Sequence, residues 1–187
     1  MSIRTFLACP SAVLFAACAG GPPPVALSVP TTLIPVGEKL VGTVVAQGVQ
    51  IYECRVKSGD STGPEWVFVA PEADLFDEHG KPTGKHYAGP RWDAGDGSVI
   101  AGTVRASVGA PRPDSIPWLL LTTQSVGGPG RFAAVTSVQR IDTAGGTAPD
   151  AGCTPAVLGR TVRVPYAAVY AMFSKSSGPT GAIVRNQ

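Results

Sequence analysis

The chain has 187 residues and a formal net charge of +2 at pH 7, from 15 basic and 13 acidic side chains. The basic residues are scattered, which argues against nucleic acid as a partner because phosphates are neutralised by grouped Lys and Arg. The 23 glycines and 18 prolines are spread along the chain. This spacing favours short strands between turns over long helices.

The first 17 residues have the pattern of an export signal, in which Arg4 precedes an apolar run over 6–17. The run is too short to span a bilayer, which takes about 20 residues. Cys18 follows two alanines directly, and this arrangement resembles a bacterial lipoprotein signal. We therefore expect a lipid anchor at Cys18 and a location on the periplasmic side of the bacterial envelope. A plain secretory signal, which would leave Cys18 unmodified and the protein secreted, is the alternative.

The remainder divides into three parts by composition. Residues 18–35 form an uncharged stretch rich in Gly, Pro and Ala, which predicts an extended tether. Residues 36–175 have the length of a single domain. Residues 176–187 contain few core candidates, so we expect a loose tail.

The chain has four cysteines, and their positions predict which of them can form a disulfide. Cys9 leaves with the signal and Cys18 carries the lipid, so Cys54 and Cys153 remain in an oxidising compartment. We predict that they form a disulfide. A pair of buried free thiols is the other possibility, and the lack of CxxC spacing disfavours a metal site.

Alternating or apolar segments recur between turn signals, and no window shows a sustained helical stripe. Residues 50–56 and 98–104 alternate with period two, as strands with one buried face do. We therefore predict an all-β domain, an antiparallel sandwich or barrel of about ten short strands. An α+β domain with a short helix near 167–173 is the alternative. The predicted strands are 39–46, 50–57, 66–70, 73–77, 85–87, 98–108, 118–126, 132–142, 161–164 and 168–174.

The chain has two histidines, His79 and His86, and they flank a turn over 80–84. A hairpin symmetric about Pro82 would place Glu78 opposite His86. It would also send the two imidazoles to opposite faces of the sheet, which disfavours a shared metal ion. We predict no metal site, and we expect His86 to pair with Glu78 or with an aspartate.

Polar and aromatic residues are most concentrated between His86 and Ser98, among glycines and prolines. Glycines let the backbone approach a ligand, and amphipathic rings supply flat contacts with a polar edge. This composition predicts a ligand-binding loop in which His86, Trp92 and Asp96 line one accessible pocket and Trp92 keeps partial exposure. The alternative is a structural loop whose rings close one end of the fold. The predicted ligand-binding residues are His86, Tyr87, Trp92, Asp96 and Ser98.

Two further side chains have structural expectations. Trp118 begins the most apolar strand, so we expect it in the core. Arg140 lies in a half-buried strand and must reach a carboxylate or solvent, because an unpaired buried charge is costly. Asp96 and Asp142 are its candidate partners.

Motifs in a fixed order give the chain a family resemblance. They include Val49-Gln50-Ile51-Tyr52-Glu53-Cys54, the run 84–92, the run 116–121, Cys153 and Val164-Pro165-Tyr166. The order resembles an uncharacterised family of exported bacterial and fungal proteins, catalogued as a domain of unknown function. The resemblance implies one intact domain and supports pairing Cys54 with Cys153.

Some fungal members of this family carry a malate dehydrogenase label, which this sequence does not support. It has no GxGxxG motif after a strand and no alternation of strands with helices, so a dinucleotide site has no framework. We predict no cofactor.

Two functional hypotheses follow from these residues. The first is an envelope domain that binds a small ligand or envelope component through the 86–98 loop. The second is a hydrolase or lyase with His86 as general base and Asp96 as its partner. The chain lacks the HExxH and P-loop motifs.

Overall fold

The computed structural model describes residues 28–56 and 63–176. The predicted signal, Cys18, most of the tether and the tail after residue 176 lie outside the described residues. No helix within the described ranges has the length and apolar character that crossing a membrane requires.

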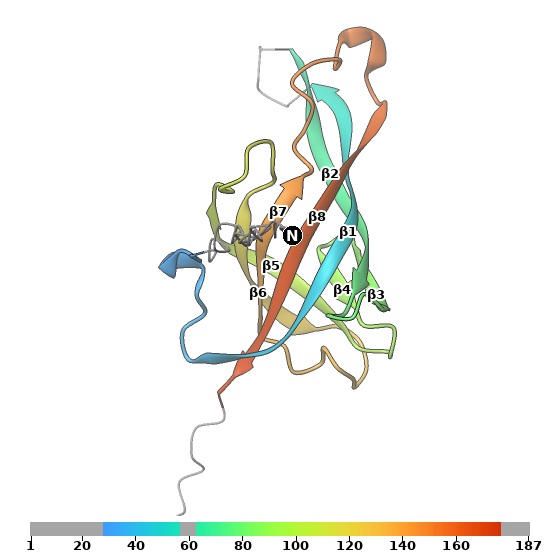
Figure 1. Ribbon diagram of the computed structural model, residues 1–187. Helices are drawn as coiled ribbons and strands as arrows, with labels where there is room; N and C mark the ends of the chain where they lie inside the picture. Colours follow the sequence, from blue (N-terminus) through green and yellow to red (C-terminus); the bar gives the residue numbers. More distant parts are fainter. Residues whose placement is uncertain (1–27, 57–62, 177–187) are drawn as a thin grey trace, which may run out of the picture.

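The described residues form a closed barrel of eight antiparallel strands, each paired with the next along the chain (Figure 1). The first and last strands pair over most of their length and close the barrel. Short 3-10 turns, η1 (Thr31–Leu33) and η2 (Pro155–Val157), precede the first and last strands, and η1 lies against β5 and β6. The strands are β1 (Glu38–Val56), β2 (Pro64–Phe76), β3 (Pro82–Tyr87), β4 (Arg91–Asp93), β5 (Val99–Val108), β6 (Trp118–Ser125), β7 (Ser137–Gly145) and β8 (Thr161–Lys175).

Period-two alternation determines which side chains fill the barrel. In β1 the even-numbered positions between 44 and 54 are the more buried ones, and in β8 the buried even positions run from 166 to 172. Successive strand residues point to opposite faces, so these positions share the inner face. The all-β prediction is therefore confirmed, and the architecture is a barrel.

The number of strands differs from the prediction. Three predicted breaks are wrong, because the chain stays extended through Gly48, Pro71 and Pro165 and joins six short segments into β1, β2 and β8. Arg91–Asp93, predicted as loop, forms β4. Ten segments thus become eight strands. The alternative of a helix near 167–173 is wrong, since β8 includes those residues.

The predicted strand over 132–142 begins later than expected, at Ser137. Phe132 and Val135 lie in the β6–β7 connection, and both are buried in the hydrophobic core. Their apolar side chains gain more from filling the barrel than from extending a ladder.

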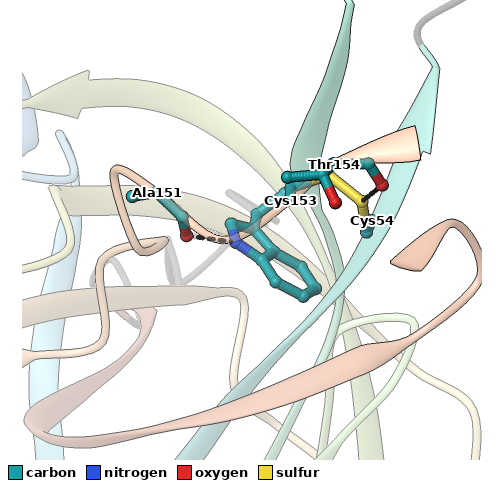
Figure 2. Close-up of a disulfide and its surroundings, with 5 residues drawn as sticks. Cys54, Ala151, Cys153 and Thr154 are labelled. Carbon is teal, nitrogen blue, oxygen red and sulfur yellow. Dashed lines mark hydrogen bonds between the residues drawn. A yellow bond between two sulfur atoms is a disulfide. The ribbon is translucent and has the colours of Figure 1, made fainter. Parts of the chain in front are cut away.

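The predicted disulfide between Cys54 and Cys153 is confirmed (Figure 2). It ties the long β7–β8 connection, residues 146–160, to the end of β1. The Trp66 indole N–H donates to the Ala151 carbonyl at 2.9 Å in the same place. The connection is therefore fixed to β1 and β2 by both covalent and polar links.

Candidate functional site

The structure separates the residues predicted to form one binding loop. His86 and Trp92 face the barrel interior and line an internal pocket. Asp96 lines a different depression, together with Arg131. The expectation of a common pocket for His86, Trp92 and Asp96 is wrong, because β3 and β4 send the first two residues inward and the chain then turns away.

Asp96 organises the turn that follows β4. Its carboxylate accepts hydrogen bonds from the backbone N–H and hydroxyl of Ser98, at 3.0 and 2.6 Å, and from the backbone N–H of Arg131 at 2.8 Å. These donors, the Arg131 N–H first, lower the pKa of Asp96 to about 2. The fully buried Ser98 hydroxyl also accepts the Phe132 N–H at 3.0 Å. This network fastens the β6–β7 connection to the turn.

The barrel interior has a packed part and an open part. The packed part consists mainly of aliphatic side chains, such as those of Leu75, Ile100 and Val138. The open part is a pocket of about 530 Å³, within the usual range of small-molecule sites. Phe68, Val69 and Val104 line it and are 44 to 51% exposed, so the pocket opens to solvent at these residues.

Three rings in mutual contact form the floor of this pocket, and we call His86, Trp92 and Tyr170 the aromatic floor. His86 and Trp92 are cross-strand partners in β3 and β4, and their rings stack with centroids 4.6 Å apart. Tyr170 of β8 packs against both rings, at 5.0 and 5.3 Å. Trp92 is 1% exposed, so the expectation of partial exposure is wrong. Tyr87, at the end of β3, is half-buried and does not line this pocket.

His86 is a neutral side chain in this setting. Its Nδ1 lies 2.8 Å from the Arg91 carbonyl oxygen. Because a carbonyl only accepts, Nδ1 carries the proton and Nε2 carries the lone pair. Burial lowers the pKa of His86 to about 4, against the opposing effect of this hydrogen bond.

The predicted pairing of His86 with a carboxylate is wrong. In the pairing of β2 with β3, Ala73 and not Glu78 lies opposite His86. The turn occupies 77–81, so the hairpin is not symmetric about Pro82. With Asp96 in a different depression, the acid–base pair of the hydrolase or lyase hypothesis is not formed. Within the described residues, no group of three or more His, Cys, Asp or Glu side chains is placed to hold a metal ion.

Arg140 of β7 is the charged residue of the pocket lining. Its Nε and Nη2 donate to the Pro117 carbonyl oxygen at 3.0 and 2.8 Å. Neither predicted partner pairs with it, since Asp142 contacts Arg112 and Asp96 binds backbone N–H groups. Trp118, by contrast, is buried as predicted.

The sequence interpretation missed Gln50, Arg140 and Tyr170 as pocket residues. Gln50 and Arg140 share one sequence pattern, in which a polar residue stands two positions from a buried one and therefore on the same face of the strand. Gln50 lies two residues before the buried Tyr52, and Arg140 lies two residues after the buried Val138. A polar residue on the inner face of a strand marks a site that apolar packing does not fill.

The fold and the pocket together define an up-and-down barrel with an internal cavity of ligand size. The chain matches the family described as "Protein of unknown function (DUF3455)" over residues 35–174, and it belongs to that family. Searches of the curated proteins and of the solved structures find no match.

Proposed function

We propose that this domain binds a small, largely apolar molecule in the pocket above the aromatic floor. The observation that carries the proposal is the open cavity of about 530 Å³ inside a closed barrel. Eight-stranded barrels either fill their interior with side chains or hold one small ligand. Here one part is filled and the other is open, with apolar walls.

The polar atoms of the pocket support the same proposal. Trp92 Nε1 is buried and has no hydrogen-bond partner among the described residues. Gln50 Nε2 and the Tyr170 hydroxyl are buried as well, and their contacts with the Tyr166 hydroxyl lack normal hydrogen-bond geometry. Buried polar groups ordinarily have partners, and an unpartnered group costs free energy. Several such atoms around one cavity are accounted for if a ligand supplies their partners.

A neutral fluorescent probe tests the binding proposal. We expect 1-aminoanthracene, an apolar dye, to bind with a rise in fluorescence. Val104→Trp should weaken this binding, because Val104 lines the pocket opening. Val126→Trp is the matched control: both valines are 51% exposed, and Val126 lies outside the pocket. Absence of binding, or equal effects of the two substitutions, would contradict the proposal.

We further propose that the domain works in the cell envelope, attached through lipid on Cys18. The small residues before Cys18 support the anchor, and the disulfide is compatible with an exported protein. Cys18→Ser should move the protein from the membrane fraction to the soluble envelope fraction, with Cys9→Ser as a control that leaves fractionation unchanged. A Cys18→Ser protein that stays with the membranes would overturn the anchor.

A further inference from the structure

The pocket holds one positively charged side chain whose charge is not balanced by a neighbour. Arg140 lies opposite Leu119 and Tyr170 in the sheet, and all three line the pocket. The described cations that form ion pairs do so elsewhere, at exposed or half-buried carboxylates. Within residues 28–56 and 63–176, no carboxylate forms an ion pair with Arg140.

The guanidinium is oriented and still has bonding capacity. A guanidinium carries five N–H donors, and the Pro117 carbonyl engages Nε and Nη2. The guanidinium also contacts the Tyr170 hydroxyl, although not in a hydrogen bond of normal geometry. The side chain is therefore held in place at one edge, with further donors left for a ligand.

The Arg140 charge acts on the whole open part of the interior. It lowers the pKa of Tyr52, Tyr170 and His86, in each case as a smaller effect than burial. Burial by itself raises the pKa of the two tyrosines and lowers that of His86. Arg140 itself is half-buried, so an anion bound to it would be less screened by solvent than an anion at a fully exposed arginine.

The unpartnered atoms around the cavity are mainly donors. The Trp92 indole N–H has no partner among the described residues. The Gln50 amide and the Tyr170 hydroxyl both contact the Tyr166 hydroxyl, and Tyr170 also contacts Arg140, but none of these contacts has normal hydrogen-bond geometry. The Gln50, Trp92 and Tyr170 side chains are at most 2% exposed and line the cavity that Arg140 lines. Acceptor oxygens on a ligand would satisfy the indole and amide N–H groups, and a hydroxyl can donate to them as well.

We infer that the pocket recognises a small amphipathic carboxylic acid, with its carboxylate on Arg140 and its apolar body over the aromatic floor. This inference rests on the proposed function and adds the ligand class. A carboxylate has two acceptor oxygens in the geometry that a guanidinium matches. Arg140 is the single cation of the lining, which suits one negative charge. A hydrophilic anion would leave the aliphatic walls and the rings without contacts.

A matched pair of probes tests the ligand class. 1-Naphthaleneacetic acid and 1-naphthaleneacetamide share one ring system, and the first carries a carboxylate where the second carries a neutral amide. By calorimetry at pH 7 we expect the acid to bind about tenfold or more tightly, as charge-assisted bonds to Arg predict. Arg140→Gln should weaken binding of the acid more than binding of the amide and so remove the preference. Arg112→Gln, at an exposed arginine outside the pocket, is the control and should keep the preference.

Each outcome of this experiment has one meaning. Equal binding of acid and amide, while 1-aminoanthracene binds, would overturn the carboxylate inference and leave the binding proposal standing. A preference that survives Arg140→Gln would place the carboxylate elsewhere and also overturn the inference. Binding of none of the three probes would overturn both proposals.

The Arg140→Gln variant also loses contacts to the Pro117 carbonyl, so Arg140→Lys serves as the second variant. It keeps the charge and loses the fork that matches two oxygens, so the preference should shrink without disappearing. An unchanged preference in Arg140→Lys together with a lost one in Arg140→Gln supports charge recognition. A loss in both variants, with circular dichroism unchanged and 1-aminoanthracene still bound, supports the bidentate contact.

Discussion

His86 makes the stability of this domain depend on pH, and the structure gives both the sign and the size. The pKa is 6.5 in an exposed histidine and about 4 in the folded protein. Between these values the unfolded chain binds a proton that the folded chain does not, so stability is lost as the pH falls through this window. From pH 7 to pH 4.5 the free energy of unfolding should fall by about 2 kcal/mol through this residue.

The measurement is urea denaturation at both pH values, with the disulfide intact. His86→Asn places an amide near Nδ1 and cannot titrate, so its stability should fall by about 2 kcal/mol less than that of the wild type. His79→Asn is the control, because the His79 side chain is 82% exposed. The carboxylates contribute equally to the pH dependence of stability in wild type and in both variants. Equal pH dependence in wild type and His86→Asn would refute the reasoning, and an NMR titration of the ring reports the pKa directly.

Three further substitutions have expected outcomes in chemical denaturation. Gly48→Ala should lower the free energy of unfolding by about 1–3 kcal/mol, because a Cβ at Gly48 would collide with the Glu72 carbonyl oxygen. Gly42→Ala should lower it much less, because a Cβ there meets nothing within 4 Å. Similar losses in the two variants would contradict the close approach at Gly48. Cys54→Ala combined with Cys153→Ala should lower stability by up to about 4.7 kcal/mol, and two reactive thiols in the unreduced, denatured wild type would disprove the bond. Ser98→Ala should cost about 1–3 kcal/mol because a buried backbone N–H loses its acceptor, and no measurable loss would remove that role.

Alternation in the sequence was enough to predict the fold class, because it depends on neighbours two residues apart. The number of strands was not predictable from the same local signals. Gly48, Pro71 and Pro165 are turn residues by composition, yet each lies within a strand. Long strands in a barrel bend along their length, and glycine or proline can occupy such a bend. In the sequence alone, these residues look like a turn between two strands.

The candidate site was predicted only in part, because some of its residues are close in sequence and others are not. His86 and Trp92 are close in sequence, and their concentration with other rings and polar groups was visible. Gln50, Arg140 and Tyr170 come from β1, β7 and β8 and meet only because the barrel closes. Their proximity depends on pairing between distant strands, which one sequence does not reveal.

The closure of β1 on β8 also dictates an order of assembly. β1 cannot complete its hydrogen bonds until β8, the last strand of the chain, has arrived, and until then one of its edges stays open to wrong partners. Cys153 precedes β8, and its bond to Cys54 holds the start of β8 beside the end of β1, where Glu53 pairs with Thr161. With the crosslink in place, the loop that must close to pair β1 with β8 falls from about a hundred residues to a few. Once formed, the bond between Cys54 and Cys153 favours the β1–β8 register of the closed barrel.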